Sequence, residues 1–87
     1  MNVDNTLDER GKNYGEYINL ATISQSFKAV LRDSPNWKAL SHDMQESLDM
    51  ICHKMARILN GNPYHFDSWH DIIGYARLIE SELDKDK

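Results

Sequence analysis

The side chains that could do chemistry in this 87-residue chain are carboxylates and cations in its second half. Asp67 and Asp71 stand four residues apart, and Glu46 and Asp49 stand three apart. Each spacing places two carboxylates on the same side of a helix. Because Mg²⁺ binds hard oxygen ligands, which a helical bundle can project inward, these acids are the candidate ligands of a magnesium ion.

Lys54 and Arg57 form a cationic pair, three residues apart and off the main apolar stripe of their predicted helix. They could contact the phosphates of a nucleotide whose metal is held by Asp67 and Asp71. They could equally neutralise these two carboxylates across a pair of helices, which needs no ligand. A semi-buried charge without a partner costs several kcal/mol, so the residues alone favour the structural network and leave the ligand open.

The other reactive residue types indicate no catalytic motif. Cys52 is the only cysteine and lies in an apolar stripe, so it is expected to be a buried, inert thiol in a reducing compartment. Four isolated glycines form no phosphate-binding loop. The histidines lack the paired short spacings of a zinc site and are interpreted as exposed or capping residues; they are His42, His53, His65 and His70.

Apolar residues that recur at spacings of three and four predict three helices, over 14–32, 42–60 and 68–84. Pro35 and Pro63 follow the first two helices, where proline stops the hydrogen-bond pattern. Ser41 and Asp67 are expected N-caps. Gly61 is expected to end the second helix in the left-handed conformation.

These elements predict an all-α fold, a small bundle of three main helices in one domain over 14–87, preceded by a polar N-terminal arm or short helical turn over 1–13. Tyr75 and Leu78 lie off the main apolar stripe of the last helix. Gly74 costs that helix about 1 kcal/mol and predicts a close neighbour, which could be the first helix, a second copy or a flat ligand. Because Tyr75 and Leu78 give this small domain a second apolar face, we expect a partner helix from another copy, and hence a homo-oligomer, a dimer or larger.

Net charge and hydropathy narrow the partners further. Fourteen acidic and ten basic residues give a formal charge of −4, which opposes binding to nucleic acid phosphates. No apolar run reaches the roughly 18 residues of a membrane span, and the N-terminus lacks the pattern of a signal peptide. The expected location is the cytoplasm.

Four blocks of the sequence resemble a family of small uncharacterised phage and prophage proteins; they are residues 9–17, 35–37, 53–61 and 67–76. The last block, which begins Asp-Ser-Trp-His-Asp, is also similar to the final helix of MazG-like all-α nucleotide pyrophosphohydrolases, which use Mg²⁺. This resemblance, taken together with the charged residues described above, gives a candidate nucleotide-binding set and a candidate magnesium set. They are Lys54, Arg57, Trp69 and Tyr75 for the nucleotide, and Asp67 and Asp71, with Glu46 and Asp49 as further acids, for the metal.

Two functions are compatible with these observations. The first is a phage-type, MazG-like protein that binds a nucleotide with Mg²⁺ between its second and third predicted helices. Because the Glu-Glu-x-x-Glu helix of those enzymes is replaced here by residues 45–49, Gln-Glu-Ser-Leu-Asp, such a protein could be catalytically degenerate. The second is a noncatalytic phage accessory protein that binds and inhibits a host or defence protein through a shaped, charged surface.

Overall fold

The computed structural model describes residues 2–85 and is helical throughout, with no strand in this range. Its elements are α1 (Val3–Tyr14), α2 (Tyr17–Asp33), the short 3-10 helix η1 (Trp37–Ala39), α3 (His42–Asn60) and α4 (Phe66–Asp84). The all-α prediction is confirmed. None of the helices within this range is both long enough and apolar enough to cross a membrane.

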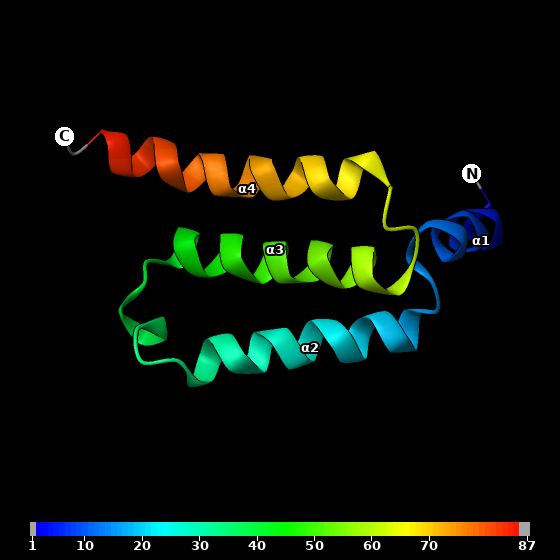
Figure 1. The fold of residues 1–87 in the computed structure, drawn as a ribbon, viewed down its shortest axis with the longest axis horizontal. Helices are drawn as coiled ribbons and strands as arrows, with labels where there is room; N and C mark the ends of the chain where they lie inside the picture. Colours follow the sequence, from blue (N-terminus) through cyan, green and yellow to red (C-terminus); the bar gives the residue numbers. More distant parts are fainter. Residues whose placement is uncertain (1, 86–87) are drawn as a thin grey trace.

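Three long helices lie side by side in an elongated layer with α3 in the middle (Figure 1). Successive helices run antiparallel, and α3 packs against both α2 and α4. The molecule measures 46 × 26 × 23 Å. The short helix α1 lies at the end of the layer where α3 ends and both α2 and α4 begin (Figure 1).

The three predicted helices are present with small shifts at their starts. The middle one, α3, has the predicted bounds, and Ser41 is its N-cap residue. The last one, α4, begins at Phe66 with His65 in the capping position. The N-cap prediction for Asp67 is therefore wrong: this residue lies in the first turn, where its negative charge still suits the helix dipole.

Helix α1, which is additional to the three predicted helices, occupies most of the segment for which a polar arm or a short helical turn was expected. Asn2 caps it, because its Oδ1 accepts a hydrogen bond of 2.8 Å from the backbone N–H of Asp4. No residue of α1 is buried, and Val3 and Leu7 are largely exposed. The helix therefore has no continuous apolar stripe that the sequence could have revealed.

Hydrogen bonds to backbone carbonyls join the end of α3 to the end of α1 and to the loop after it. The side-chain amide of Asn60 donates to the carbonyls of Tyr14 (2.8 Å) and Glu16 (3.0 Å). Gly61 follows, with φ −129°, so the expected left-handed cap is wrong. Gly61 is required for a different reason: a Cβ there would overlap the backbone of Asn13 and Tyr14.

The buried core is small and built largely from small side chains. Leu20, Cys52 and Ala56 are its buried apolar residues, and three serines are buried among the helices with them. Small residues allow close helix packing, but they remove little apolar area from water. The expected burial of Cys52 is confirmed, and this burial raises the pKa of its thiol, which keeps it protonated.

Candidate functional site

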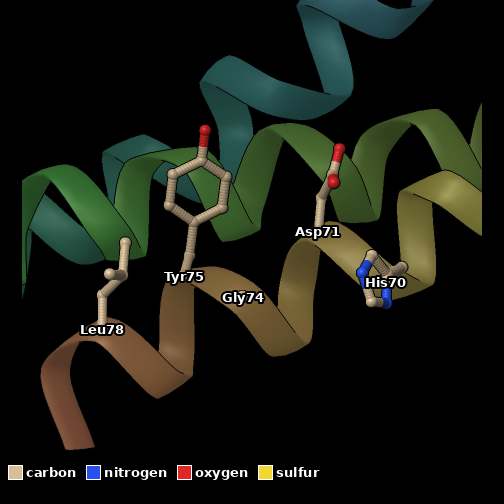
Figure 2. A pocket seen from close by; sticks show the side chains of 5 residues that line it. All are labelled: His70, Asp71, Gly74, Tyr75 and Leu78. Carbon is tan, nitrogen blue, oxygen red and sulfur yellow. The ribbon is translucent and has the colours of Figure 1, made fainter. Parts of the chain in front are cut away.

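Lys54 and Asp71 form an ion pair between α3 and α4, with Nζ and Oδ2 3.0 Å apart. The Lys54 side chain is 10% exposed and that of Asp71 is 42% exposed. Asp71 points from α4 toward α3 (Figure 2). The pairing weighed from the sequence is thus present for these two residues, and it compensates the charge of a nearly buried ammonium group.

Beside this ion pair, α4 lines a shallow hollow of about 370 Å³. Its lining residues are His70, Asp71, Gly74, Tyr75 and Leu78 (Figure 2). Among the described residues, apart from the backbone of its own helix, nothing lies within 4 Å of a Cβ built on Gly74. The first predicted helix, which is α2, is therefore not the close neighbour that this glycine led us to expect. Of the predicted site residues, the structure brings Lys54, Asp71 and Tyr75 into one region.

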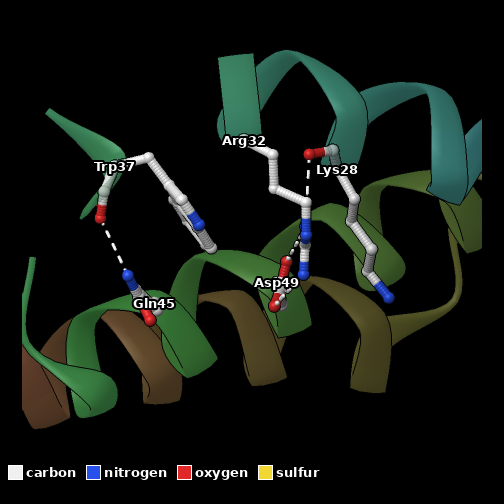
Figure 3. A network of polar contacts seen from close by, with 5 residues as sticks. All are labelled: Lys28, Arg32, Trp37, Gln45 and Asp49. Atoms are coloured by element: carbon white, nitrogen blue, oxygen red, sulfur yellow. Dashed lines mark hydrogen bonds and ion pairs between the residues drawn. The ribbon is translucent and has the colours of Figure 1, made fainter. Parts of the chain in front are cut away.

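Asp49, another of the candidate acids, has a different partner from Asp71. Asp49 faces α2, where its two carboxylate oxygens accept hydrogen bonds of 3.0 Å from Nη1 and Nη2 of Arg32 (Figure 3). This bidentate contact raises the pKa of Arg32. Glu46 and Asp67 are exposed on α3 and α4. Within residues 2–85, no group of three or more histidine, cysteine or acidic side chains is placed to hold a metal ion.

Arg32 also supports the connection between α2 and α3. Its guanidinium group lies 5.1 Å from the ring centre of Trp37. The side-chain amide of Gln45 donates to the Trp37 carbonyl at 2.8 Å (Figure 3). These contacts give Asp49 a structural role at the opposite side of α3 from Lys54.

Trp69, another predicted nucleotide contact, lies at the start of α4 and supports the α3–α4 loop. Its indole Nε1 donates to the carbonyl of Pro63 at 2.8 Å, while about half of the side chain stays exposed. Trp69 therefore holds the α3–α4 loop, whereas Lys54 and Asp71 connect the two helices themselves.

Arg57, the remaining predicted contact, lines a different pocket of about 470 Å³ between α1, α2 and α3. Its guanidinium carbon lies 4.2 Å from the ring centre of Tyr14, a cation–π contact. Its Nε is buried and has no hydrogen-bond partner among the described residues. Polar and aromatic side chains line much of the pocket; they are Arg10, Tyr14, Glu16, Tyr17, His53 and Arg57.

The electrostatic environment of this pocket is cationic. Burial lowers the pKa of His53, and the positive charges of Arg57, Lys28 and Lys54 lower it further. His53 is therefore neutral at pH 7. Arg10 and Arg57 give the pocket lining two positive charges, and Glu16 gives it one negative charge. The lining is therefore net positive, although the net charge of the chain is −4.

Comparison with known families assigns residues 3–83 to the family described as "Domain of unknown function (DUF6378)". The chain belongs to the DUF6378 family. The matched range begins with α1, so the helix that frames the Arg57 pocket is part of the DUF6378 domain. No curated protein and no solved structure matches the chain.

Sequence reasoning identified Arg57 but missed the residues around it in this DUF6378 domain. Arg10, Tyr14 and Tyr17 belong to the block over 9–17, which had been noted for its resemblance alone. In that block, Gly11 and Gly15 stand between charged and aromatic residues, a pattern that could have indicated a binding site. His53 had been interpreted as an exposed or capping residue, whereas in the structure it is half-buried and lines this pocket with residues of α1 and α2.

Proposed function

We propose that this DUF6378 protein binds a nucleotide, or a closely related phosphate ester, in the pocket between α1, α2 and α3. The observation that supports this proposal most directly is the buried Nε of Arg57, a strong donor without an acceptor. An unpaired buried donor is costly unless a ligand or water completes it. A phosphate oxygen is the acceptor that a guanidinium group binds best, with two parallel hydrogen bonds.

The charge around the pocket favours an anion. Arg10 and Arg57 line it, and the charges of Lys28 and Lys54 reach His53. A concave site lined with one sign of charge raises the local concentration of ligands of the opposite sign. The overall charge of −4 repels long polyanions, so a small phosphate ester suits this protein better than DNA or RNA.

The remaining walls suit the organic part of such a ligand. Leu7 and Leu20 are apolar, and the rings of Tyr14 and Tyr17 offer surfaces on which a base can stack. The volume of about 470 Å³ lies within the ordinary range for small-molecule sites. Together these features favour a mononucleotide over inorganic phosphate.

The phage-type, MazG-like assignment is also part of this proposal, and it rests on the block over 67–76. Two of the acids that would hold Mg²⁺ in such an enzyme have cationic partners, since Asp71 pairs with Lys54 and Asp49 with Arg32. We therefore propose binding without assigning a metal-dependent step to these residues.

A binding screen with nucleoside mono- and triphosphates, and with the matching deoxynucleotides, tests the proposal. A free ligand at ten times its dissociation constant adds about 1.4 kcal/mol to the free energy of unfolding, which shifts the melting temperature by several degrees. The matching nucleosides, which lack phosphate, should give no shift. Pyrophosphate detection with Mg²⁺ and Mn²⁺ reports turnover separately. If no nucleotide changes the melting temperature, the proposal is wrong.

A matched pair of variants locates the ligand. Arg10 lines the pocket, whereas Lys12, on the same helix, does not. Arg10→Gln should weaken binding of the selected nucleotide about tenfold or more, because a charge-assisted hydrogen bond contributes roughly 1.5–3 kcal/mol. Lys12→Gln removes the same charge outside the pocket and should change affinity less than threefold. Equal losses in both variants would place the ligand elsewhere.

The second candidate function is a noncatalytic accessory protein that binds a host or defence protein. It is favoured by the number of large apolar side chains left exposed, Tyr64 and Phe66 among them. Affinity capture from host lysate should then recover a stoichiometric partner. Absence of such a partner, together with no effect of the protein on phage growth, would remove this candidate.

A further inference from the structure

An apolar groove runs between α3 and α4 on a part of the surface that the Arg57 pocket does not use. Its volume is about 360 Å³. Apart from Leu40, which precedes α3, the side chains that line it come from the first half of α3 and the second half of α4; six of them are Met44, Leu48, Ile51, Ala76, Ile79 and Leu83. No charged residue lines this groove.

The apolar surface of the groove continues along α3. Met44, Leu48 and Ile51 are followed by Met55 and Leu59 at helical spacing, so one stripe extends over nearly the whole helix. Met55 is 38% exposed and Leu59 is 64% exposed. Met44, Leu48 and Ile51 are half-buried beside α4, so the open apolar surface of this stripe consists of the groove and of the exposed Met55 and Leu59.

The total exposed area of the chain is large enough for such a surface to be covered by a second protein chain. A compact monomer of 10.1 kDa exposes about 5,300 Å², whereas this chain exposes 6582 Å². The excess is about 1,300 Å². A standard protein interface buries about 800 Å² on each partner, so the excess is large enough for a stable dimer.

We infer that this groove is the interface with a second copy of the chain, in which α3 and α4 pack against the same two helices of the partner. The two helices are antiparallel, contain 19 residues each and share one apolar seam, which is half of a four-helix bundle. A two-fold axis places identical surfaces together, and a groove without charged lining brings no like charges into contact.

This interface leaves the Arg57 pocket open. Arg57 and Met55 stand two positions apart on α3, which places them about 200° apart around the helix axis. Assembly and ligand binding therefore use opposite sides of α3 and can be tested independently. The inference does not depend on the proposed nucleotide.

The test is the mass of the full chain in solution by light scattering or sedimentation velocity over a range of micromolar concentrations. Leu83→Lys and Met44→Glu each place a charge in the groove, at a helix end whose dipole favours that charge. Leu78→Lys is the control, because Leu78 is 62% exposed on α4 and lies in the other hollow, beside Asp71. Circular dichroism checks that all three variants keep their helical content.

The wild type and Leu78→Lys are expected to have twice the mass of one 10.1 kDa chain. Leu83→Lys and Met44→Glu should raise the dimer dissociation constant at least about tenfold. A wild type that stays monomeric at every concentration overturns the inference, as does an assembly that both groove variants leave intact. Loss of the dimer in Leu78→Lys alone would move the interface to the other face. A monomer that instead takes up a foreign protein in the groove would also overturn it.

Discussion

Lys54 is the charged side chain that the fold buries most completely within residues 2–85. Its sequence neighbours left two roles open, phosphate binding or ion pairing, because spacing along a helix does not reveal what faces it from another helix. The contact with Asp71 favours the second role. Arg57, only one turn away, lies against Tyr14 and into a pocket, so the two cations have different environments.

Substitution of Asp71 tests the role of this ion pair. Asp71→Asn should lower the free energy of unfolding by about 1–3 kcal/mol, because it leaves the Lys54 ammonium group buried without a counter-charge. Lys54→Met should cost less, since its apolar chain fills the same space and the exposed carboxylate can be solvated. Urea denaturation measures both. A gain in wild-type stability on adding Mg²⁺ that Asp71→Asn abolishes would instead favour the metal role.

The pH dependence of stability should report on His53. Its pKa in the folded protein lies below the ordinary value of about 6.5, so the unfolded chain binds a proton more readily. The resulting stabilisation is present above pH 6.5 and is lost as the pH falls below that value. In His53→Gln, which cannot titrate, the loss of stability between pH 7 and 5 should be smaller than in the wild type. Identical pH profiles would contradict this expectation.

At the scale of elements, the sequence predicted what apolar periodicity encodes. The bounds of α3 follow from a stripe that recurs over its whole length, with Ser41 before it and Gly61 after it. Helix α1 was not predicted, because its stability depends on Asn2 at one end and on contacts with the end of α3 at the other. The backbone N–H of Asn62 donates to the Asn13 carbonyl at 2.6 Å. This is a tertiary contact, which no local sequence pattern predicts.

Gly61 gives a direct test of how α1 is held. Gly61→Ala places a methyl group against the backbone of Asn13 and Tyr14, so it should destabilise the protein by about 1–3 kcal/mol and release α1. Gly11→Ala is the matched control, because its Cβ meets nothing within 4 Å and alanine favours a helix; it should stabilise by about 0.5–1 kcal/mol. Hydrogen exchange in α1 and thermal unfolding measure the effects. Equal stability of the two variants would contradict the conclusion that close contact between Gly61 and the backbone of Asn13 and Tyr14 holds α1 in place.

At the scale of the whole molecule, the layer has two faces with different chemistry. One side of α3 carries the cationic Arg57 pocket, and another carries the apolar groove between α3 and α4. The sequence supplied Arg57 as a candidate, but three helices build its pocket, and their arrangement is a tertiary property. The same limit explains why spacing paired the four candidate acids but could not show that Asp49 faces Arg32 and Asp71 faces Lys54.

The most direct test of the nucleotide proposal is the nuclear magnetic resonance signal of the Arg57 Nε–H group during titration with a mononucleotide, with phosphate-free nucleoside as the control. The proposal predicts a progressive, saturating downfield shift as this buried donor gains a phosphate acceptor. The corresponding signals of Arg32, which is bound to Asp49, and of Arg77 on α4 should stay in place. An unchanged Arg57 signal at saturating nucleotide, or a shift that the nucleoside reproduces, would contradict the proposed site.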